Sequence, residues 1–489
     1  MTLQVLIIYI AIAAVILTVL IGLLKKGHKS WLMTFLQNFT GVLFIVSGMV
    51  KAVDPLGTAY KMEQYFTEFE YTFSETSASF LAPLFPFLSS IAIWFSVAMI
   101  VFEIVLGVML ILGHRPKLTS WLFLALVVFF TALTGFTFLT GYVPSDGNFF
   151  RFASWGPYST TNMKVTDCGC FGDFIKLDPK ISFFKDVVLL LPALYFVFRH
   201  RDMHQLFTPR ARAIIVGLIT VLLILFCLRN FYWGLPVVDF RPFKVGTNLY
   251  EKKTAEEEAQ ANVKVTLRMQ NKKTGEIVEM PQDIYMANWQ KYPKEEWTSL
   301  EPIKSKPEIE ETKVSQFSLT DKDGYDVAED ILTDSGHVFL IVAYKLKGES
   351  HTQETMIPDT TWSTDTVELM NTGSKTVVRT PALIGTKKVV KEVYVWDEAY
   401  IRHYVEKVNP LMESVMGQGA KVYAAAGGAG IEKLEAFKQA TGSPYEWHEA
   451  DDILLKTIIR SNPGVVHIKG GTVMDMWHIR NLPKSVTLN

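Results

Sequence analysis

Residues 85–113 read FPFLSSIAIWFSVAMIVFEIVLGVMLILG and carry a single charged residue, Glu103. A stretch of this length and hydropathy is long enough to cross a bilayer as a helix. Similar stretches occur at residues 3–24, 31–50, 118–143, 181–198 and 213–232. The first half of the chain is therefore predicted to form an α-helical membrane bundle of six spans.

The charge-free part of the fifth segment covers only residues 187–198 and follows Lys185 and Asp186, so its length alone is also compatible with an interfacial helix. Basic residues gather in cytoplasmic loops, and six spans, unlike five, place the short basic loops on one face. We therefore expect a protein of the bacterial inner membrane with both termini outside the cytoplasm. A loop over residues 54–84 and the loop that contains Cys168 and Cys170 are expected on the same, periplasmic face. The basic loops contain Lys25, Lys26 and Lys29, then Arg115 and Lys117, then Arg199, Arg201, Arg210 and Arg212.

Charge and length exclude some classes of protein. The formal net charge is -1, so no basic field favours nucleic acid as a partner. The segment 3–24 is too long for the core of a secretory signal, and we interpret it as a retained span.

Three charged residues are predicted at membrane depth, with Lys51 and Asp54 closing the second span and Glu103 in the middle of the third. A charge there is costly unless it is paired, so each is a candidate for a transport or binding pathway. Alternatively, Glu103 pairs with Lys51 or with a backbone donor and locks the bundle. Small residues predict close packing of the second and third spans, namely Gly41, Ser47, Gly48 and Gly107.

Two of the three cysteines lie in one loop, which reads Asp167-Cys168-Gly169-Cys170-Phe171-Gly172-Asp173. The pair is a redox centre, half of a metal site or a structural clip. A disulfide between residues two apart is strained and labile, which favours redox chemistry over a clip. A zinc site needs further ligands that the loop lacks, so we predict no metal.

Neighbouring residues support this loop in the prediction. Gly169 supplies backbone freedom for a tight ring, Gly172 indicates a turn, and Phe171, Lys185 and Asp186 are expected to hold the loop and the next helix. Cys227, near the end of the sixth span, is either a relay thiol or a small buried apolar residue.

These motifs resemble the DoxX/MauE group of bacterial membrane proteins over residues 31–200. The matching elements are Ser47-Gly48 with Lys51 and Asp54-Pro55, Glu103 with Gly107 and Gly113, and Cys168-Gly169-Cys170-Phe171-Gly172. The resemblance implies a four-helix membrane core. It also implies a link to methylamine utilisation, to disulfide formation in exported proteins and, through DoxX relatives, to a possible quinone cofactor. The first and sixth spans are additions to that pattern.

The second half of the chain reads as a soluble α/β region. A mixed polar subdomain is expected over residues 235–314, with short strands around residues 266–270 and 277–280. Beyond it, strands and helices alternate, which indicates a partly parallel sheet. The expected elements are the buried strand 338–344, the helix 397–416, the strand 421–425, the helix 431–441 and a strand pair over residues 462–473.

This order resembles a thioredoxin-like fold over residues 315–489, with Pro463 at the position of its cis-proline. The thiol motif of that fold would follow strand 338–344, where the chain has a polar insertion without cysteine. The resemblance therefore implies a binding platform rather than dithiol chemistry in this domain.

We predict five parts: an extra span (1–30), a DoxX/MauE-like domain (31–200), a sixth span and connector (201–234), a lead-in subdomain (235–314) and a thioredoxin-like domain (315–489). Three functions remain open. The first is an anchored scaffold or accessory subunit that binds an exported or envelope protein, with or without a part in its thiol chemistry through Cys168 and Cys170. The others are a quinone-coupled thiol–disulfide oxidoreductase and a transporter of small molecules or lipids.

Overall fold

The computed structural model describes residues 2–24, 30–144, 146–165, 169, 171–172, 174–368 and 375–488. The chain divides into two compact units. The first contains residues 1–316 together with residues 457–461, and the second contains residues 317–456 and 462–489.

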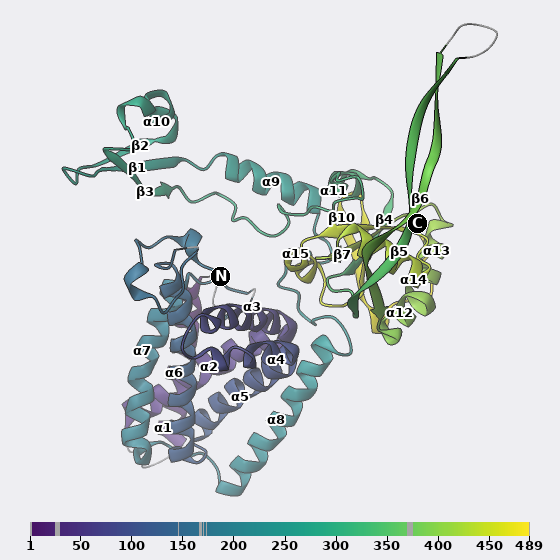
Figure 1. The fold of residues 1–489 in the computed structure, drawn as a ribbon. Helices are drawn as coiled ribbons and strands as arrows, with labels where there is room; N and C mark the ends of the chain where they lie inside the picture. Colours follow the sequence, from purple (N-terminus) through teal and green to yellow (C-terminus); the bar gives the residue numbers. More distant parts are fainter. Residues whose placement is uncertain are drawn as a thin grey trace. The chain divides into compact units, whose positions relative to one another are not determined.

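Six helices of the first unit are long and apolar enough to cross a membrane, which confirms the predicted number (Figure 1). The doubtful fifth one is a helix of 21 residues that begins before its two charged residues. Their bounds are α1 Leu3–Leu24, α2 Trp31–Val53, α5 Ala92–Leu112, α6 Pro116–Thr140, α7 Pro179–Arg199 and α8 Pro209–Phe231.

The segment between the second and third spans differs from the expected loop. It forms helix α3 (Pro55–Ser74), in which Asp54 caps the N-terminus and Pro55 occupies the first turn. The predicted third span is also divided, since α4 (Leu84–Ser90) ends one residue before α5 begins at Ala92. α3 is amphipathic and rich in polar residues, so hydropathy alone did not reveal it.

Helices α2 and α5 cross with their backbones in contact, as the small residues predicted. A methyl group added to Gly41 would lie 2.9 Å from the carbonyl oxygen of Gly107, and one added to Gly107 would lie 2.7 Å from that of Gly41. Gly48 similarly faces Ile104. Glycine is required at this crossing because any side chain would push the helices apart.

The segment after α8 begins with helix α9 (Leu249–Ala261) and continues into a small antiparallel sheet. The sheet has the strand order β2-β1-β3, so both predicted strands of this region are present. Its elements are β1 Val265–Asn271, β2 Ile277–Pro281, α10 Gln282–Asn288 and β3 Trp297–Lys304.

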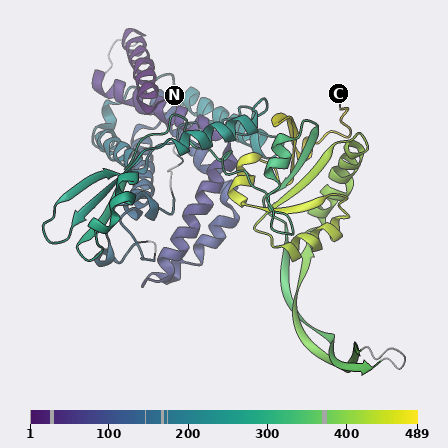
Figure 2. The same ribbon diagram turned by 90° about the horizontal axis from the view of Figure 1, so that it is seen from above.

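The second unit is built on a five-stranded mixed sheet with the order β10-β9-β4-β7-β8 (Figure 2). β4 is parallel to β7 and β7 to β8, whereas β9 is antiparallel to both β4 and β10. The strands are β4 His337–Ala343, β7 Lys421–Gly427, β8 Glu446–Ala450, β9 Gly464–Lys469 and β10 Thr472–His478.

Helices connect these strands and supply much of the core. The predicted helix 397–416 consists of α12 (Glu398–His403), a π-helical turn (Tyr404–Val408) and α13 (Asn409–Met416). Tyr404, Phe437 and Trp447 pack together with Phe339 of β4 in one buried cluster. The remaining helices are α11 Ala328–Thr333, α14 Ile431–Thr441 and α15 Asp452–Ile458.

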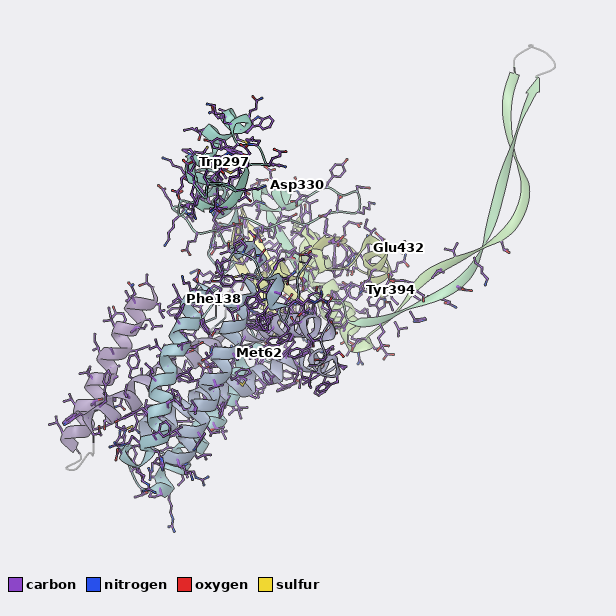
Figure 3. All side chains as sticks on the ribbon, turned by 60° about the vertical axis from the view of Figure 1, so that its left-hand side comes forward. Met62, Phe138, Trp297, Asp330, Tyr394 and Glu432 are labelled. Atoms are coloured by element: carbon purple, nitrogen blue, oxygen red, sulfur yellow. The ribbon has the colours of Figure 1, made fainter. Side chains whose placement is uncertain are left out.

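The polar insertion after β4 is a long antiparallel hairpin of β5 (Gly348–Glu368) and β6 (Lys375–Trp396). It extends away from the five-stranded sheet, with Tyr394 near the end of β6 that adjoins the rest of the unit (Figure 3). The described part of the second unit is thus an α/β domain with an inserted hairpin, in which the Asn462–Pro463 peptide bond is cis.

Candidate functional site

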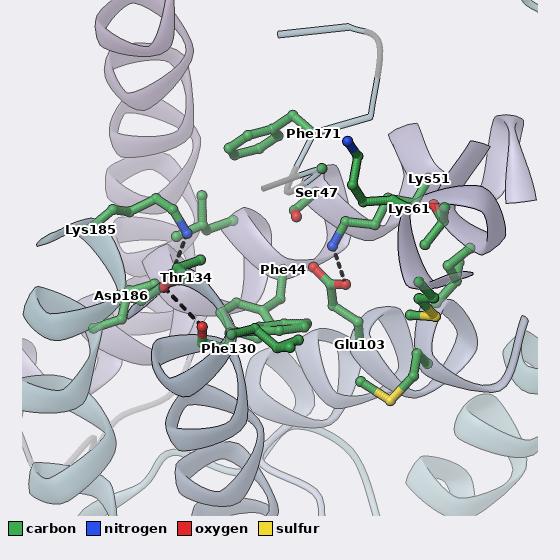
Figure 4. Close-up of a pocket in the computed structure, with 18 of the residues that line it drawn as sticks. Phe44, Ser47, Lys51, Lys61, Glu103, Phe130, Thr134, Phe171, Lys185 and Asp186 are labelled. Atoms are coloured by element: carbon green, nitrogen blue, oxygen red, sulfur yellow. Dashed lines mark hydrogen bonds and ion pairs between the residues drawn. The ribbon is translucent and has the colours of Figure 1, made fainter. Parts of the chain in front are cut away.

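A cavity of about 80 Å³ lies inside the first unit, where α2 ends and α3 begins (Figure 4). Its walls come from α2, α3, α5, α6 and α7, and from residues Gly169 and Phe171 of the connection between α6 and α7. The aromatic rings of Phe44, Phe130 and Phe171 alternate on its walls with charged side chains. Such a mixture of apolar surface and a few convergent polar groups is typical of a small-molecule site.

The first charged group in the cavity is the ion pair between Lys51 and Glu103. Their Nζ and Oε2 atoms are 2.6 Å apart, and the residues are only 7% and 3% exposed. The ammonium group also lies 5.2 Å from the centre of the Phe130 ring, a cation–π contact. The pairing anticipated from the sequence is therefore present, and it links α2 to α5 at the cavity wall.

A second ion pair, between Lys185 and Asp186 of α7, lines the opposite side of the cavity (Figure 4). Asp186 is 1% exposed and accepts a hydrogen bond from the Thr134 hydroxyl of α6 at 3.0 Å. These residues were predicted as support at the end of a helix. The structure shows them within the first half of α7, with their charges at the cavity, and their supporting role stays a prediction.

The loop that carries the cysteines contributes directly to the cavity. Gly169 has a φ of +60°, and a methyl group added to it would lie 3.1 Å from Cγ of Lys61 on α3. Phe171 is 1% exposed, and Gly172 has a φ of +52°. Cys168 and Cys170 lie outside the described residues, so their candidate redox role stays a prediction.

Asp54 was predicted as a polar group within the membrane, and this placement stays a prediction. It lies one residue beyond the second span and caps α3 by accepting a hydrogen bond from the Gly57 amide at 3.0 Å. Both of its carboxylate oxygens are bound by Arg460, at 3.0 and 2.9 Å from Nε. Burial alone would raise the pKa of Asp54, but the adjacent guanidinium outweighs it and holds the pKa below its usual value.

Cys227 of α8 is fully buried in an apolar cluster with Ala52, Val97, Ile100 and Ile104. This environment is typical of a small apolar residue. The alternative role of relay thiol stays a prediction.

In the second unit, Asn462 and Pro463 adjoin a hydrogen-bonded group of buried phenols. The Tyr400 hydroxyl donates to Asn462 Oδ1 at 2.9 Å and lies 3.1 Å from the Tyr404 hydroxyl. Burial raises the pKa of Tyr404 well above its usual value, which keeps that phenol neutral. The group can bind and orient, but it offers no thiol.

Several residues of the cavity region were missed by the sequence analysis. Lys61 lies on α3, in a segment that we expected to form a loop. Thr134 is a polar residue inside an apolar span, and nothing in its sequence neighbourhood distinguishes it. Arg460 lies 406 residues from Asp54 in the chain. One sequence signal could have revealed Lys61, namely the amphipathic periodicity of residues 55–74, which indicates a helix.

A comparison with protein families matches residues 29–145 to the family described as "Methylamine utilisation protein MauE". The matched segment includes the α2, α3, α5 and α6 walls of the cavity, and it ends before Gly169 and α7. Neither a search of curated proteins nor a search of solved structures finds a match. Residues 29–145 are thus similar to the MauE family, within a chain whose six long apolar helices indicate a multi-pass membrane protein.

Proposed function

From this MauE-type membrane region, we propose that the protein is a membrane-anchored accessory subunit that assists thiol–disulfide exchange of exported proteins through Cys168 and Cys170. The observation that carries the proposal is the position of Gly169, which lines a cavity flanked by two buried ion pairs. Gly169 is bonded to both cysteines in the chain. We place the protein in the bacterial inner membrane with this loop on the periplasmic side, where disulfides persist.

The proposed exchange has a simple balance. Two thiols of an exported client are oxidised to a disulfide, while the Cys168–Cys170 disulfide is reduced to a dithiol that takes up two protons. A disulfide between residues two apart is strained, and a strained bond has a higher reduction potential. Such a pair is therefore better suited to passing oxidation on than to holding a loop permanently.

A quinone fits the residues of the cavity as the electron acceptor of this reaction. The cavity offers ammonium groups from two separate walls, Lys51 and Lys185, which donate to carbonyl oxygens, and it offers the rings of Phe44 and Phe130 to a planar ring. When bound, a quinone would accept two electrons and two protons. Glu103 and Asp186, each paired with a lysine, hold the two ammonium groups in place.

The second unit is proposed to hold the client. Its cis peptide before Pro463 and its strand order support the thioredoxin-like interpretation. The chain has no cysteine after Cys227, so this unit contributes recognition rather than electron transfer.

Maleimide-shift trapping in intact, acid-quenched cells tests the proposal, with Cys168→Ser and Cys170→Ser to assign the bands and Cys227→Ser as the matched control. We expect a mixture of thiol and disulfide forms that an impermeant reagent reaches and that shifts with mild oxidant or reductant. A pair locked in one form under all these conditions would contradict the proposal.

The buried charges favour a second candidate, a transporter of small molecules or lipids that uses Lys51, Glu103 and Asp186. Glu103→Gln separates the two functions. Loss of growth or transport in a folded Glu103→Gln variant that still cycles its cysteines normally would favour transport. A purely structural scaffold predicts instead that Cys168→Ser with Cys170→Ser leaves function intact.

A further inference from the structure

Arg460 is a buried cation that the proposed reaction does not use. It is 4% exposed and belongs to the first unit through the short segment of residues 457–461. We propose that Arg460 is a positioning residue for the cavity: through Asp54, it fixes the corner between α2 and α3, and with it the cavity lysines Lys51 and Lys61.

The contact between Arg460 and Asp54 has the geometry of a strong, specific link. Nε lies within hydrogen-bond distance of both carboxylate oxygens, and Nη2 lies 2.8 Å from Oδ2. The guanidinium also lies 5.4 Å from the centre of the Tyr60 ring on α3. Charge-assisted contacts of this kind fix orientation as well as distance.

Asp54 connects this cation to both helices of the corner. Its backbone amide donates to the carbonyl of Lys51 at the end of α2, and its carboxylate caps the Gly57 amide at the start of α3. A methyl group on Gly57 would lie 2.7 Å from Asp54 Oδ2 and 3.0 Å from Arg460 Nη2, so the corner has no spare room. The carboxylate cannot move without moving the helix ends.

The helix ends in turn carry cavity residues. Lys51, which pairs with Glu103, is about one helical turn before Asp54, and Lys61, which packs on Gly169, is about two turns after it. A shift of the corner therefore changes both the ion pair and the contact with the cysteine loop. The segment of residues 457–461, which contains Arg460, is held by a second contact, because Arg241 donates a hydrogen bond to the Ile458 carbonyl at 3.1 Å.

The inference rests on the proposed function in one respect, because the reactivity of Cys168 and Cys170 is used to report on the geometry of the cavity. The experiment measures the rate at which Cys168 and Cys170 are alkylated, as a function of pH, in reduced full-length protein in nanodiscs. All variants carry Cys227→Ser, so that only these two thiols react. The set is Arg460→Gln, Asp54→Asn, both together, Arg460→Lys, and Arg199→Gln as control, because Arg199 forms an ion pair with Asp202 away from the cavity.

We expect Arg460→Gln and Asp54→Asn each to change the alkylation rate at neutral pH by at least about threefold, since half a unit of thiol pKa changes the thiolate fraction by that factor. The double variant should change it no more than the larger single change, because both act through one link. Arg460→Lys keeps the charge and should restore part of the wild-type profile. Arg199→Gln should leave the profile unchanged.

The inference would be overturned if Arg460→Gln and Asp54→Asn kept the wild-type pH profile of alkylation. It would also be overturned if the rate changes of these two variants multiplied in the double variant. An equal change in Arg199→Gln would do the same. If Arg460→Gln does not fold, the profile of Arg460→Lys against Asp54→Asn decides. A pair that never cycles in cells but whose alkylation depends on Arg460 sinks the proposed function alone, whereas a cycling pair that is insensitive to Arg460 sinks this inference alone.

Discussion

The membrane region and the second unit both have tightly packed interiors, but they bury different groups. The cavity of the membrane region holds two ion pairs, Lys51–Glu103 and Lys185–Asp186. The central strand of the second unit buries an uninterrupted apolar run, from Val338 to Ala343. Buried charges are costly unless they are paired, and this is why we propose that the chemistry draws on the membrane region and that the second unit recognises the client.

The largest effect is expected from breaking the Lys51–Glu103 pair. Glu103→Gln leaves a buried ammonium group without its counter-charge, which costs about 3–5 kcal/mol in proteins. Thermal unfolding of the detergent-solubilised protein measures the loss. Lys388→Gln is the matched control, because Lys388 pairs with Glu354 on the exposed hairpin and should contribute no more than about 0.5 kcal/mol. Equal effects of the two variants would remove the basis of the comparison.

A slightly smaller effect is expected from Ile341→Ala in the middle of β4. Ile341 is fully buried, so the cavity created should destabilise the second unit by about 2–5 kcal/mol. Hydrogen exchange of the full-length protein should show faster exchange in β4, β7 and β9, and unchanged protection in α2 and α5. Equal loss of protection in α2 would show that the two regions do not differ in stability as independent units.

Acid should weaken the second unit through His467. Burial and the neighbouring His337 lower its pKa from 6.5 to about 4, and its ring stacks on Phe339 with the centres 4.5 Å apart. The unfolded chain therefore binds a proton that the folded unit excludes, so stability falls as the pH drops from about 6.5 to about 4. Hydrogen exchange of β9 against pH measures this, and His467→Phe should flatten the curve. An unchanged slope in His467→Phe would assign the pH dependence to another group.

The smallest of these effects is expected from Gly169→Ala. A side chain at a φ of +60° costs about 1–2 kcal/mol, and here it also presses on Lys61. We expect a local change in the alkylation of Cys168 and Cys170 with little change in global unfolding. Gly156→Ala is the control, because a methyl group there meets no atom within 4 Å.

The features that depend on local composition could be read from the sequence. The six spans followed from hydropathy, the α2–α5 crossing from Gly41 and Gly107, and the Lys51–Glu103 pair from the cost of isolated charge at membrane depth. The central strand of the second unit followed from the β-branched apolar run 338–344, whereas β8 was not expected.

The features that depend on contacts between residues far apart in the chain could not be read from the sequence. α3 mixes aromatic and charged residues and passed for a loop, and the polar insertion after β4 gave no sign of the length of β5 and β6. Nothing near Arg460 in the chain indicates that its partner is Asp54. A cavity is formed by several helices at once, so its position follows from packing rather than from any single motif.

The glycine contact between α2 and α5 determines how a molecule can reach the cavity. Backbone atoms of Gly41 and Gly107 touch there, and Ile104 fills the space beside Gly48. This contact therefore closes the path from the lipid into the cavity between these two helices. For the proposed quinone, the path then leads past another wall of the cavity. Gly169 and Phe171 line one of these walls, and they are direct chain neighbours of the cysteines.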